Sequence, residues 1–362
     1  MSLRILIDVH HHALLESLHM LFADRFGAEV WCPWGMDWFE SGVWQHEMKH
    51  HGDAVARQYL EGIWAEAREV GDDFMRGTIT QRDRRHPGRV WHGTSYLAAK
   101  NDMWDLVISS LPDNDEGFAA LAKATGARFG VQVGNNLQFS RWDLAEFILA
   151  SSTLDGFGPE WAGKRFEFHG VPTVMYHQEF SLDTFRYEYP PAERRTVASF
   201  VNCFPEAPSY PDFLAFARVH LDEFDFKVYG ACGQPGPDEF TAGDISLVPE
   251  VAERMRAARV GVQQKHWSDG YGHVIHNWGA VGRPIIGYPR YYADKLASPL
   301  WVEGVTSWDV EGRSYDERAA ILRRLRDDDD FHRRACETMR ARFDQWVDFD
   351  HDADEVALLL GL

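Results

Sequence analysis

Residues 260–288 read VGVQQKHWSDGYGHVIHNWGAVGRPIIGY. We predict a short buried strand over Val260–Gln263, then a turn that carries two glycines, and then a helix that opens near His273. A glycine ends the predicted helix and a proline blocks its continuation, so the next strand is expected over Arg283–Gly287. A glycine turn between a strand and a helix N-terminus offers backbone N–H groups and a positive dipole end, which together favour the binding of a phosphate.

The polar side chains of this stretch separate two interpretations. In the simpler one the glycines only permit a tight turn, and short glycine motifs are common by chance. Asp269 directly precedes the turn, and His273 and Asn277 lie one helical turn apart on the face predicted to oppose the apolar stripe. A carboxylate, an imidazole and an amide beside a phosphate-sized turn indicate a sugar nucleotide as the ligand.

The stretch DGYGHVIHNWGAVGRPIIG resembles the donor-binding signature of retaining GT-B glycosyltransferases. That signature reads Glu-Gly-Phe-Gly, an apolar run, Glu, small residues and Gly-Arg/Thr-Pro-Val-Ile. The resemblance places Asp269 where the family has the glutamate that contacts the donor sugar, and Asn277 where it has the glutamate that holds the ribose. Asp269 is one methylene shorter than the usual residue and Asn277 lacks the charge, so the sugar and the base of the donor stay open.

The resemblance implies an α/β fold of GT-B architecture, with two Rossmann-like domains facing each other across a cleft and a C-terminal helix crossing back to the first domain. We expect a Rossmann-like acceptor domain over residues 1–191, a Rossmann-like nucleotide-sugar donor domain over residues 192–345, and the returning helix over residues 346–362. Pro190 and Pro191 form the predicted linker, because consecutive prolines favour an extended connection.

The resemblance further implies a retaining glycosyltransferase, of hexosyl or pentosyl type, that uses a nucleotide-diphosphate sugar and needs no cofactor and no metal. Asp269 would act in catalysis by orienting the sugar, while the glycine turn would hold the diphosphate and stabilise it as leaving group. A strand is expected over Ile245–Val248, followed by a loop that contacts the base. The predicted donor-binding residues are Gly230, Val248, Pro249, Lys265, Gly270, Tyr271, Gly272, His273 and Asn277.

Three histidines follow the first predicted strand, at the carboxyl edge where α/β sheets bind ligands. We expect His11 and His12 to be catalytic residues that face the sugar or the acceptor. His10 and Asn135 are expected to contact the acceptor. A metal site at the three histidines is the lesser alternative, since adjacent side chains do not easily converge on one ion.

A basic segment interrupts an acidic chain. The formal net charge of −19 argues against broad binding of polyanions, yet residues 76–100 hold five arginines and one lysine against a single aspartate. This segment is either a solvated loop or a track for a phosphate-bearing acceptor, with predicted contacts from Arg82, Arg84, Arg85, Arg89 and Trp91. The stretch HHHALLESLHMLFADRFGAEVW resembles glycosyltransferases carried by tailed phages, which implies a hydroxymethylated pyrimidine in DNA as that acceptor.

The composition fits a protein of two domains. The chain has 362 residues, of which 45% are hydrophobic and 26% are charged, as in ordinary globular proteins. No apolar run reaches about eighteen residues, so we predict no membrane span. The start shows no secretory leader and the four cysteines are well separated, which favours the cytoplasm, the host's if a phage encodes the chain. The oligomeric state stays open.

Three other functions remain open at this point. The acceptor of the transferase could be a small hydroxylated molecule or a glycan, which the acidic net charge favours. A sugar-nucleotide epimerase of the same fold would use the same donor site, but it needs no acceptor surface, so the basic segment counts against it. A non-catalytic binding module stays open because Asn277 replaces the second carboxylate of the signature.

Overall fold

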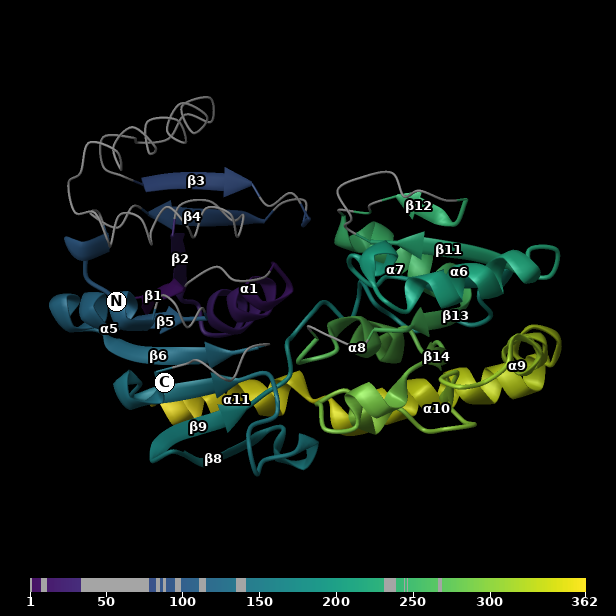
Figure 1. Cartoon of the computed structure of the whole chain (residues 1–362). Helices are drawn as coiled ribbons and strands as arrows, with labels where there is room; N and C mark the ends of the chain where they lie inside the picture. The colour runs from purple at the N-terminus through teal and green to yellow at the C-terminus, as the bar shows by residue number, and fades with distance from the viewer. Residues whose placement is uncertain are drawn as a thin grey trace. The chain divides into compact units, whose positions relative to one another are not determined.

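The chain divides into two compact α/β units in the computed structural model (Figure 1). Unit 1 comprises Met1–Phe180 with Phe349–Leu362, and unit 2 comprises Ser181–Asp348. The boundary predicted at residue 191 falls later than the start of unit 2. The residues that the structure describes are 2–7, 12–33, 78–82, 85–86, 89–94, 99–110, 115–134, 141–230, 239–243, 245, 247–265 and 269–362.

Unit 1 is built on a sheet whose described strands run in the order β3-β4-β2-β1-β5-β6-β7-β9-β8. The pairings of β3 with β4 and of β8 with β9 are antiparallel, and the other pairings are parallel. The strands are β1 (Arg4–Ile7), β2 (Glu29–Pro33), β3 (Thr78–Arg82), β4 (Val90–Thr94), β5 (Leu106–Ser109), β6 (Arg128–Val133), β7 (Phe147–Ala150), β8 (Lys164–Phe168) and β9 (Val171–Met175).

Helices cover this sheet because their apolar stripes face it. α1 (His12–His19) continues into the π-helical η1 (Met20–Arg25), and their apolar side chains Leu14, Leu18 and Phe22 are buried in one cluster with β1, β2 and β5. α11 (Phe349–Leu360) packs on β7, β8 and β9 and contributes Ala353 and Val356 to the same cluster. The other described helices of unit 1 are α5 (Asp115–Thr125) and the short η6 (Trp142–Leu144) and η7 (Pro159–Trp161).

Unit 2 contains a parallel sheet in the order β12-β11-β10-β13-β14-β15. Numbered along the chain, these strands lie in the order 3-2-1-4-5-6, which is the order of a Rossmann fold. The core between this sheet and the helices includes Phe213, Phe226, Val262 and Trp308. The strands are β10 (Glu193–Ser199), β11 (Asp225–Tyr229), β12 (Thr241–Gly243), β13 (Ala258–Gln263), β14 (Ile285–Gly287) and β15 (Ser307–Asp309).

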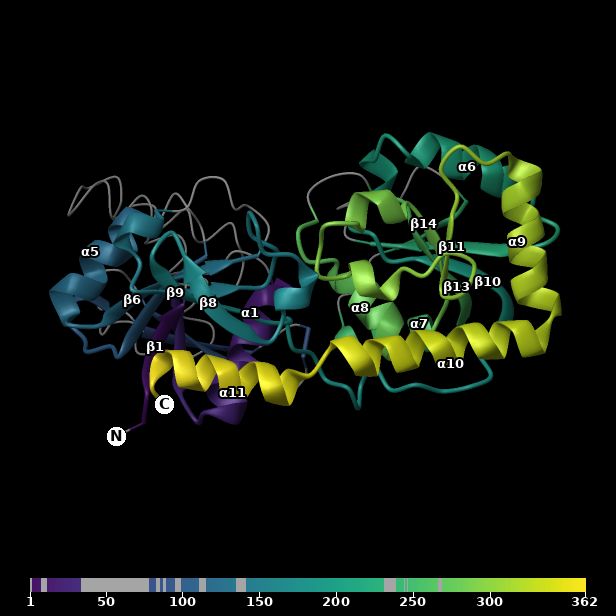
Figure 2. The ribbon, with the colours of Figure 1, turned by 90° about the horizontal axis from the view of Figure 1, so that it is seen from below.

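The helices of unit 2 alternate with its strands, and α10 packs against both α8 and α9 (Figure 2). A capping box at Ser314 and Glu317 starts α9, because each side chain satisfies an amide of the other residue. The helices are η8 (Phe204–Glu206), α6 (Tyr210–Val219), α7 (Val248–Ala257), α8 (His273–Ala280), η9 (Pro289–Tyr292), η10 (Ser298–Leu300), α9 (Tyr315–Asp327) and α10 (Asp329–Trp346).

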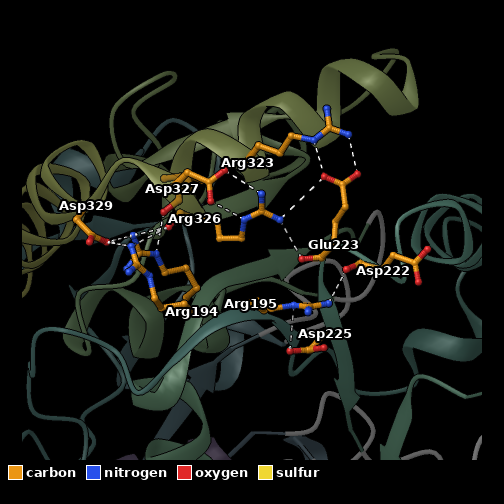
Figure 3. A network of polar contacts seen from close by, with 11 residues as sticks. Arg194, Arg195, Asp222, Glu223, Asp225, Arg323, Arg326, Asp327 and Asp329 are labelled. Atoms are coloured by element: carbon orange, nitrogen blue, oxygen red, sulfur yellow. Dashed lines mark hydrogen bonds and ion pairs between the residues drawn. The ribbon is translucent and has the colours of Figure 1, made fainter.

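A network of ion pairs ties α9 to the amino ends of β10 and β11 (Figure 3). Arg323 forms a bidentate pair with Glu223, with N–O distances of 2.6 and 2.7 Å. Arg194 donates to Asp329 at 2.7 Å, and the buried Arg259 donates to the same carboxylate at 2.8 Å. These charges stabilise the end of the sheet opposite to its carboxyl edge.

One predicted strand is wrong. Of the strand expected over Ile245–Val248, the described residues Ile245 and Leu247 belong to no strand, and Val248 begins α7 with Pro249 in its first turn, where the missing N–H of proline is not needed. Among the described residues, no helix is long and apolar enough to cross a membrane.

The segment before Pro190 is bound to unit 2. Arg283 is fully buried and donates to the carbonyl oxygen of Glu188 at 2.7 Å. Arg256 donates to the carbonyl oxygen of Thr184. The connection is therefore fastened to unit 2 by two arginines of that unit.

Candidate functional site

The stretch from β13 to β14 lies at the point where the strand order of unit 2 reverses. The chain proceeds from β10 to β11 on one side, while β13 pairs with β10 on the other side. Ligands of such sheets bind beyond the carboxyl ends of the strands at this position. The predicted strand, turn and helix are confirmed, with β13 beginning earlier, at Ala258, and β14 beginning later, at Ile285.

Gly272 ends the turn and precedes the first residue of α8. Its φ of +82° lies in the left-handed region, which glycine adopts without strain. A Cβ atom on Gly272 would lie 2.7 Å from the Cβ atom of Ala297, closer than two carbon atoms approach. Both the backbone conformation and the close packing therefore require glycine at this position.

The carboxylate of Asp269 is held on both sides. Its Oδ1 accepts the N–H of Gly272 at 2.8 Å, and its Oδ2 accepts the hydroxyl of Tyr292 at 2.9 Å. Gln263, the last residue of β13, donates its Nε2 hydrogen to the Tyr292 hydroxyl at 2.8 Å. The predicted phosphate turn therefore has its Gly272 amide already bound within the chain, which the sequence did not indicate.

Tyr291 and Tyr292 bind different parts of Asp269. The Asp269 backbone N–H donates to the Tyr291 hydroxyl at 3.1 Å. Burial raises the pKa of Tyr292 well above its usual value, and the nearby charge of Asp269 raises it further. The hydroxyl of Tyr292 therefore stays protonated and donates to the carboxylate.

Helix α8 is not two-faced as predicted. His273 and Val274 are half-buried, but every residue from Ile275 to Ala280 is buried. α10 packs against α8, and a Cβ atom on Gly279 would lie 3.0 Å from Phe343 of α10.

Two polar side chains of α8 are buried with it. The ring of His276 stacks on Tyr271, with centroids 4.1 Å apart, and its Nδ1 lies 3.0 Å from the carbonyl oxygen of Gly272. Asn277 is 4% exposed, and its side-chain oxygen has no hydrogen-bond partner among the described residues. A buried acceptor in this condition destabilises the protein unless a donor reaches it.

The remaining predicted donor residues border the same edge of the sheet. Gly230 follows β11, and a Cβ atom there would lie 2.6 Å from the carbonyl oxygen of Val201, so glycine permits the two loops to approach. Lys265 follows β13 and is half-buried. Val248 and Pro249 start α7 and do not form the loop that was predicted, and Val248 is 5% exposed.

Most of the catalytic and acceptor-binding residues predicted in unit 1 lie outside the described part of the chain. His10, His11, Arg84 and Asn135 fall outside the described residues, as do the side chains of His12, which opens α1, Arg82 in β3 and Trp91 in β4. Within the described part of the chain, no group of three or more His, Cys, Asp or Glu side chains is placed to hold a metal ion.

Two described residues of the basic segment, His86 and Arg89, are close to acids of unit 1. The guanidinium of Arg89 lies 3.6 Å from a carboxylate oxygen of Asp24, and its side chain is only 16% exposed. The ring of His86 lies 2.7 Å from the buried carboxylate of Glu16 on α1. Arg85 is half-buried. Part of the predicted positive charge is therefore neutralised within the unit.

Sequence reasoning missed three residues of the candidate site: Gln263, Tyr291 and Tyr292. One signal was present, because the tyrosine pair follows β14 closely and a strand's carboxyl end is where ligand-site residues lie. The sequence does not indicate which tyrosine contacts the Asp269 carboxylate, because that contact depends on the packing of η9.

No family model matches the chain, and no curated protein sequence matches it significantly. Solved structures of similar fold include Anabaena Alr3699/HepE in complex with UDP and glucose, with a TM-score of 0.60, 11% identity and full coverage of both chains. They also include TarM, with a TM-score of 0.60, 8% identity and coverage of 100% of this chain and 99% of that one.

A third similar structure is the sucrose-phosphate synthase of Thermosynechococcus elongatus, with a TM-score of 0.58, 11% identity and coverage of 99% of this chain and 98% of that one. Identities this low establish the fold alone. The expected fold class is thereby confirmed, and the chain has the GT-B fold of two Rossmann-like α/β units.

Proposed function

We propose that the chain is a retaining glycosyltransferase that takes its sugar from a nucleotide-diphosphate sugar. The observation that carries this proposal is the carboxylate of Asp269, held by Gly272 and Tyr292 at the switch point of a Rossmann unit. HepE, a protein of the same fold, binds UDP-glucose according to its solved complex.

The diphosphate would bind at the N-terminus of α8, where the positive end of the helix dipole favours negative charge. Since Asp269 occupies the amide of Gly272, we assign the phosphate oxygens to the following amides, including that of Val274. Lys265 adds positive charge on the same edge. This arrangement stabilises the diphosphate as it leaves, when its negative charge grows.

Asp269 and Asn277 would bind the two sugars of the donor. Each oxygen of Asp269 accepts one hydrogen bond in the protein and retains a second lone pair for a hydroxyl of the transferred sugar. The buried oxygen of Asn277 has no partner among the described residues and would accept a ribose hydroxyl. A donor ligand would thereby satisfy an acceptor that the protein leaves unsatisfied.

A melting-temperature screen against nucleotide sugars tests the donor class, because a ligand that binds only the native state raises the melting temperature. The donor that binds is then incubated with the enzyme, and NMR assigns the anomer of the released or transferred sugar. A product with the donor's anomeric configuration supports retention. Binding without turnover would favour the non-catalytic module, and an epimerised free sugar would favour the epimerase.

Two classes of acceptor are candidates for this transferase. A small hydroxylated molecule or a glycan is favoured by the net charge of −19 and by the pairing of Arg89 with Asp24. A hydroxymethylated pyrimidine in phage DNA is the second candidate, supported by the basic segment and by the half-buried Arg85 within it. A base in a duplex would have to flip out to reach the site, at a cost of a few kcal/mol.

A further inference from the structure

A chain of three hydrogen bonds fixes the carboxylate of Asp269. It runs from Gln263 in β13 to Tyr292, from Tyr292 to Asp269, and from the Gly272 amide to Asp269, with lengths of 2.8, 2.9 and 2.8 Å. The direction of each bond is determined, because an ionised carboxylate only accepts. The Tyr292 hydrogen must therefore go to Asp269, which leaves the hydroxyl lone pair for the amide of Gln263.

We propose that Tyr292 is a positioning residue of the donor site, which sets the carboxylate of Asp269 to receive hydroxyls of the donor sugar. Gln263 orients Tyr292 for this task. The inference rests on the proposed function and deepens it. Asp269 touches the sugar, whereas Tyr292 acts only through Asp269.

The support is rigid, as a positioning role requires. Tyr292 is fully buried and stacks on Trp301, with ring centroids 5.6 Å apart and an interplanar angle of 18°. Gln263 is 1% exposed and belongs to the central strand β13. A carboxylate bound on both oxygens by such a frame holds one orientation, and orientation of the reacting group contributes strongly to catalysis.

The neighbouring tyrosine provides a contrast within the same turn. Tyr291 bonds the backbone of Asp269, accepting its N–H at 3.1 Å and lying 3.4 Å from its carbonyl oxygen. Tyr292 instead donates to the side-chain carboxylate of Asp269. Replacing either tyrosine with phenylalanine removes one hydroxyl and keeps the ring, so the pair separates an effect on the backbone from an effect on the carboxylate.

The first experiment needs no ligand. Amide hydrogen exchange of Gly272 is followed by NMR in protein labelled with ¹⁵N-glycine. We expect Tyr292→Phe to accelerate this exchange at least about tenfold, because the released carboxylate no longer holds the amide, and Tyr291→Phe to accelerate it less than about threefold.

Tyr176→Phe is the matched control for losing a buried hydroxyl. Tyr176 is 2% exposed, and its hydroxyl accepts a hydrogen bond from the Gln132 amide at 3.2 Å, as that of Tyr292 does from Gln263. Tyr176 belongs to unit 1, so its variant should leave Gly272 exchange unchanged. Equal exchange in the Tyr292→Phe and native proteins, or equal acceleration in all three variants, would overturn the proposal.

The second experiment uses UDP and UDP-glucose. In Tyr292→Phe we expect the kcat for UDP-glucose turnover to fall at least about tenfold while UDP affinity, measured by calorimetry, stays within about threefold. Gln263→Leu should change both quantities in the same direction by a smaller factor. A loss of UDP affinity as large as the loss of kcat would show that Tyr292 supports the fold of the site and does not position the carboxylate.

A double-mutant cycle tests whether Tyr292 acts through Asp269. In the Asp269→Ala background, Tyr292→Phe should lower kcat by less than about threefold, because the group that it positions is gone. Fully additive losses would overturn the proposal. If the native chain turned over none of the nucleotide sugars, the proposed function would fail, and Gly272 exchange would still decide whether Tyr292 holds Asp269.

Discussion

The hydroxyl of Ser209 donates a hydrogen bond of 2.6 Å to the carbonyl oxygen of Gln264. Ser209 directly precedes α6, which follows β10, and Gln264 directly follows β13. The bond therefore joins the two segments that diverge at the switch point of unit 2. Both residues are buried, at 5% and 2% exposure, so the bond is shielded from water.

Replacing Ser209 with alanine should loosen this junction. We expect Ser209→Ala to lower the free energy of unfolding by about 1–2 kcal/mol, because the buried carbonyl of Gln264 loses its donor. The affinity for UDP should also fall, because the two segments border the proposed donor site. Ser307→Ala is the control in urea denaturation, since Ser307 is also buried but its hydroxyl has no partner among the described residues. Equal losses in both variants would contradict the prediction.

We expect Asn277 to lower the stability of the ligand-free protein and to contribute to UDP binding. We expect Asn277→Leu to leave the melting temperature of the ligand-free protein unchanged or raise it, since a buried oxygen with no partner in the described part of the chain is removed. The same variant should lose at least about tenfold in UDP affinity, because a ribose hydroxyl loses its acceptor. Calorimetry and thermal melts of one sample measure both. A lower melting temperature with unchanged affinity would assign Asn277 to the fold.

Gly272 should tolerate no side chain. Gly272→Val would place a Cβ atom 2.7 Å from Ala297 at a φ of +82°, so we expect both destabilisation and loss of donor binding. Gly304→Ala is the matched control, because Gly304 has a φ of +73° and nothing within 4 Å of its Cβ position. The control isolates the backbone strain, expected to cost about 1–2 kcal/mol. A folded Gly272→Val protein with native donor affinity would move the phosphate site elsewhere.

The local part of this site was predictable and the long-range part was not. The strand, the glycine turn and the start of α8 are determined by residues close in sequence, which is why β13 and α8 were placed correctly. The burial of α8 at Gly279 depends on the packing of α10, and the bond from Tyr292 to Asp269 depends on the packing of η9. Hydrophobic periodicity carries no information on either contact.

The wrong prediction at Val248 has a different cause. A short apolar run before a proline fits a strand end and a helix start equally, and periodicity does not separate them. Pro249 favours the helix start, since proline is common at the first helical positions, where its missing N–H is not needed. The base-contacting loop was therefore assigned to residues that begin a helix.

Acid should weaken the network of Figure 3. Arg323, and then His220, lower the pKa of the Glu223 carboxyl from 4.5 to about 2. A carboxyl with a depressed folded-state pKa contributes stability that is present above pH 4.5 and is lost as the pH falls towards 2. Because Glu223 is 29% exposed, solvent screening limits this contribution to roughly 1 kcal/mol.

Urea unfolding of the native protein and of Glu223→Gln, at neutral pH and at about pH 3, measures the contribution. We expect Glu223→Gln to be less stable at neutral pH and the difference between the two proteins to shrink in acid. If the difference in the free energy of unfolding were the same at neutral pH and at about pH 3, Glu223 would not be a source of the acid sensitivity.

The acceptor class should be visible in the salt dependence of turnover. If Arg82, Arg84, Arg85 and Arg89 each neutralised a DNA phosphate, affinity would fall on the order of a hundredfold between about 50 and 200 mM salt. Arg89 is only 16% exposed and lies 3.6 Å from Asp24, so we expect a small or glycan acceptor and a change of less than about threefold.

The deciding assay incubates the enzyme with hydroxymethylated DNA and each nucleotide sugar that raises its melting temperature, then digests the DNA to nucleosides for mass spectrometry. We expect no nucleoside with a hexose- or pentose-sized mass increase, because the charge that would hold the duplex is partly paired within unit 1. Asp269→Ala is the background control, since it lacks the carboxylate assigned to the sugar. A mass increase with the native enzyme but not with this variant would establish DNA as the acceptor and reverse our preference.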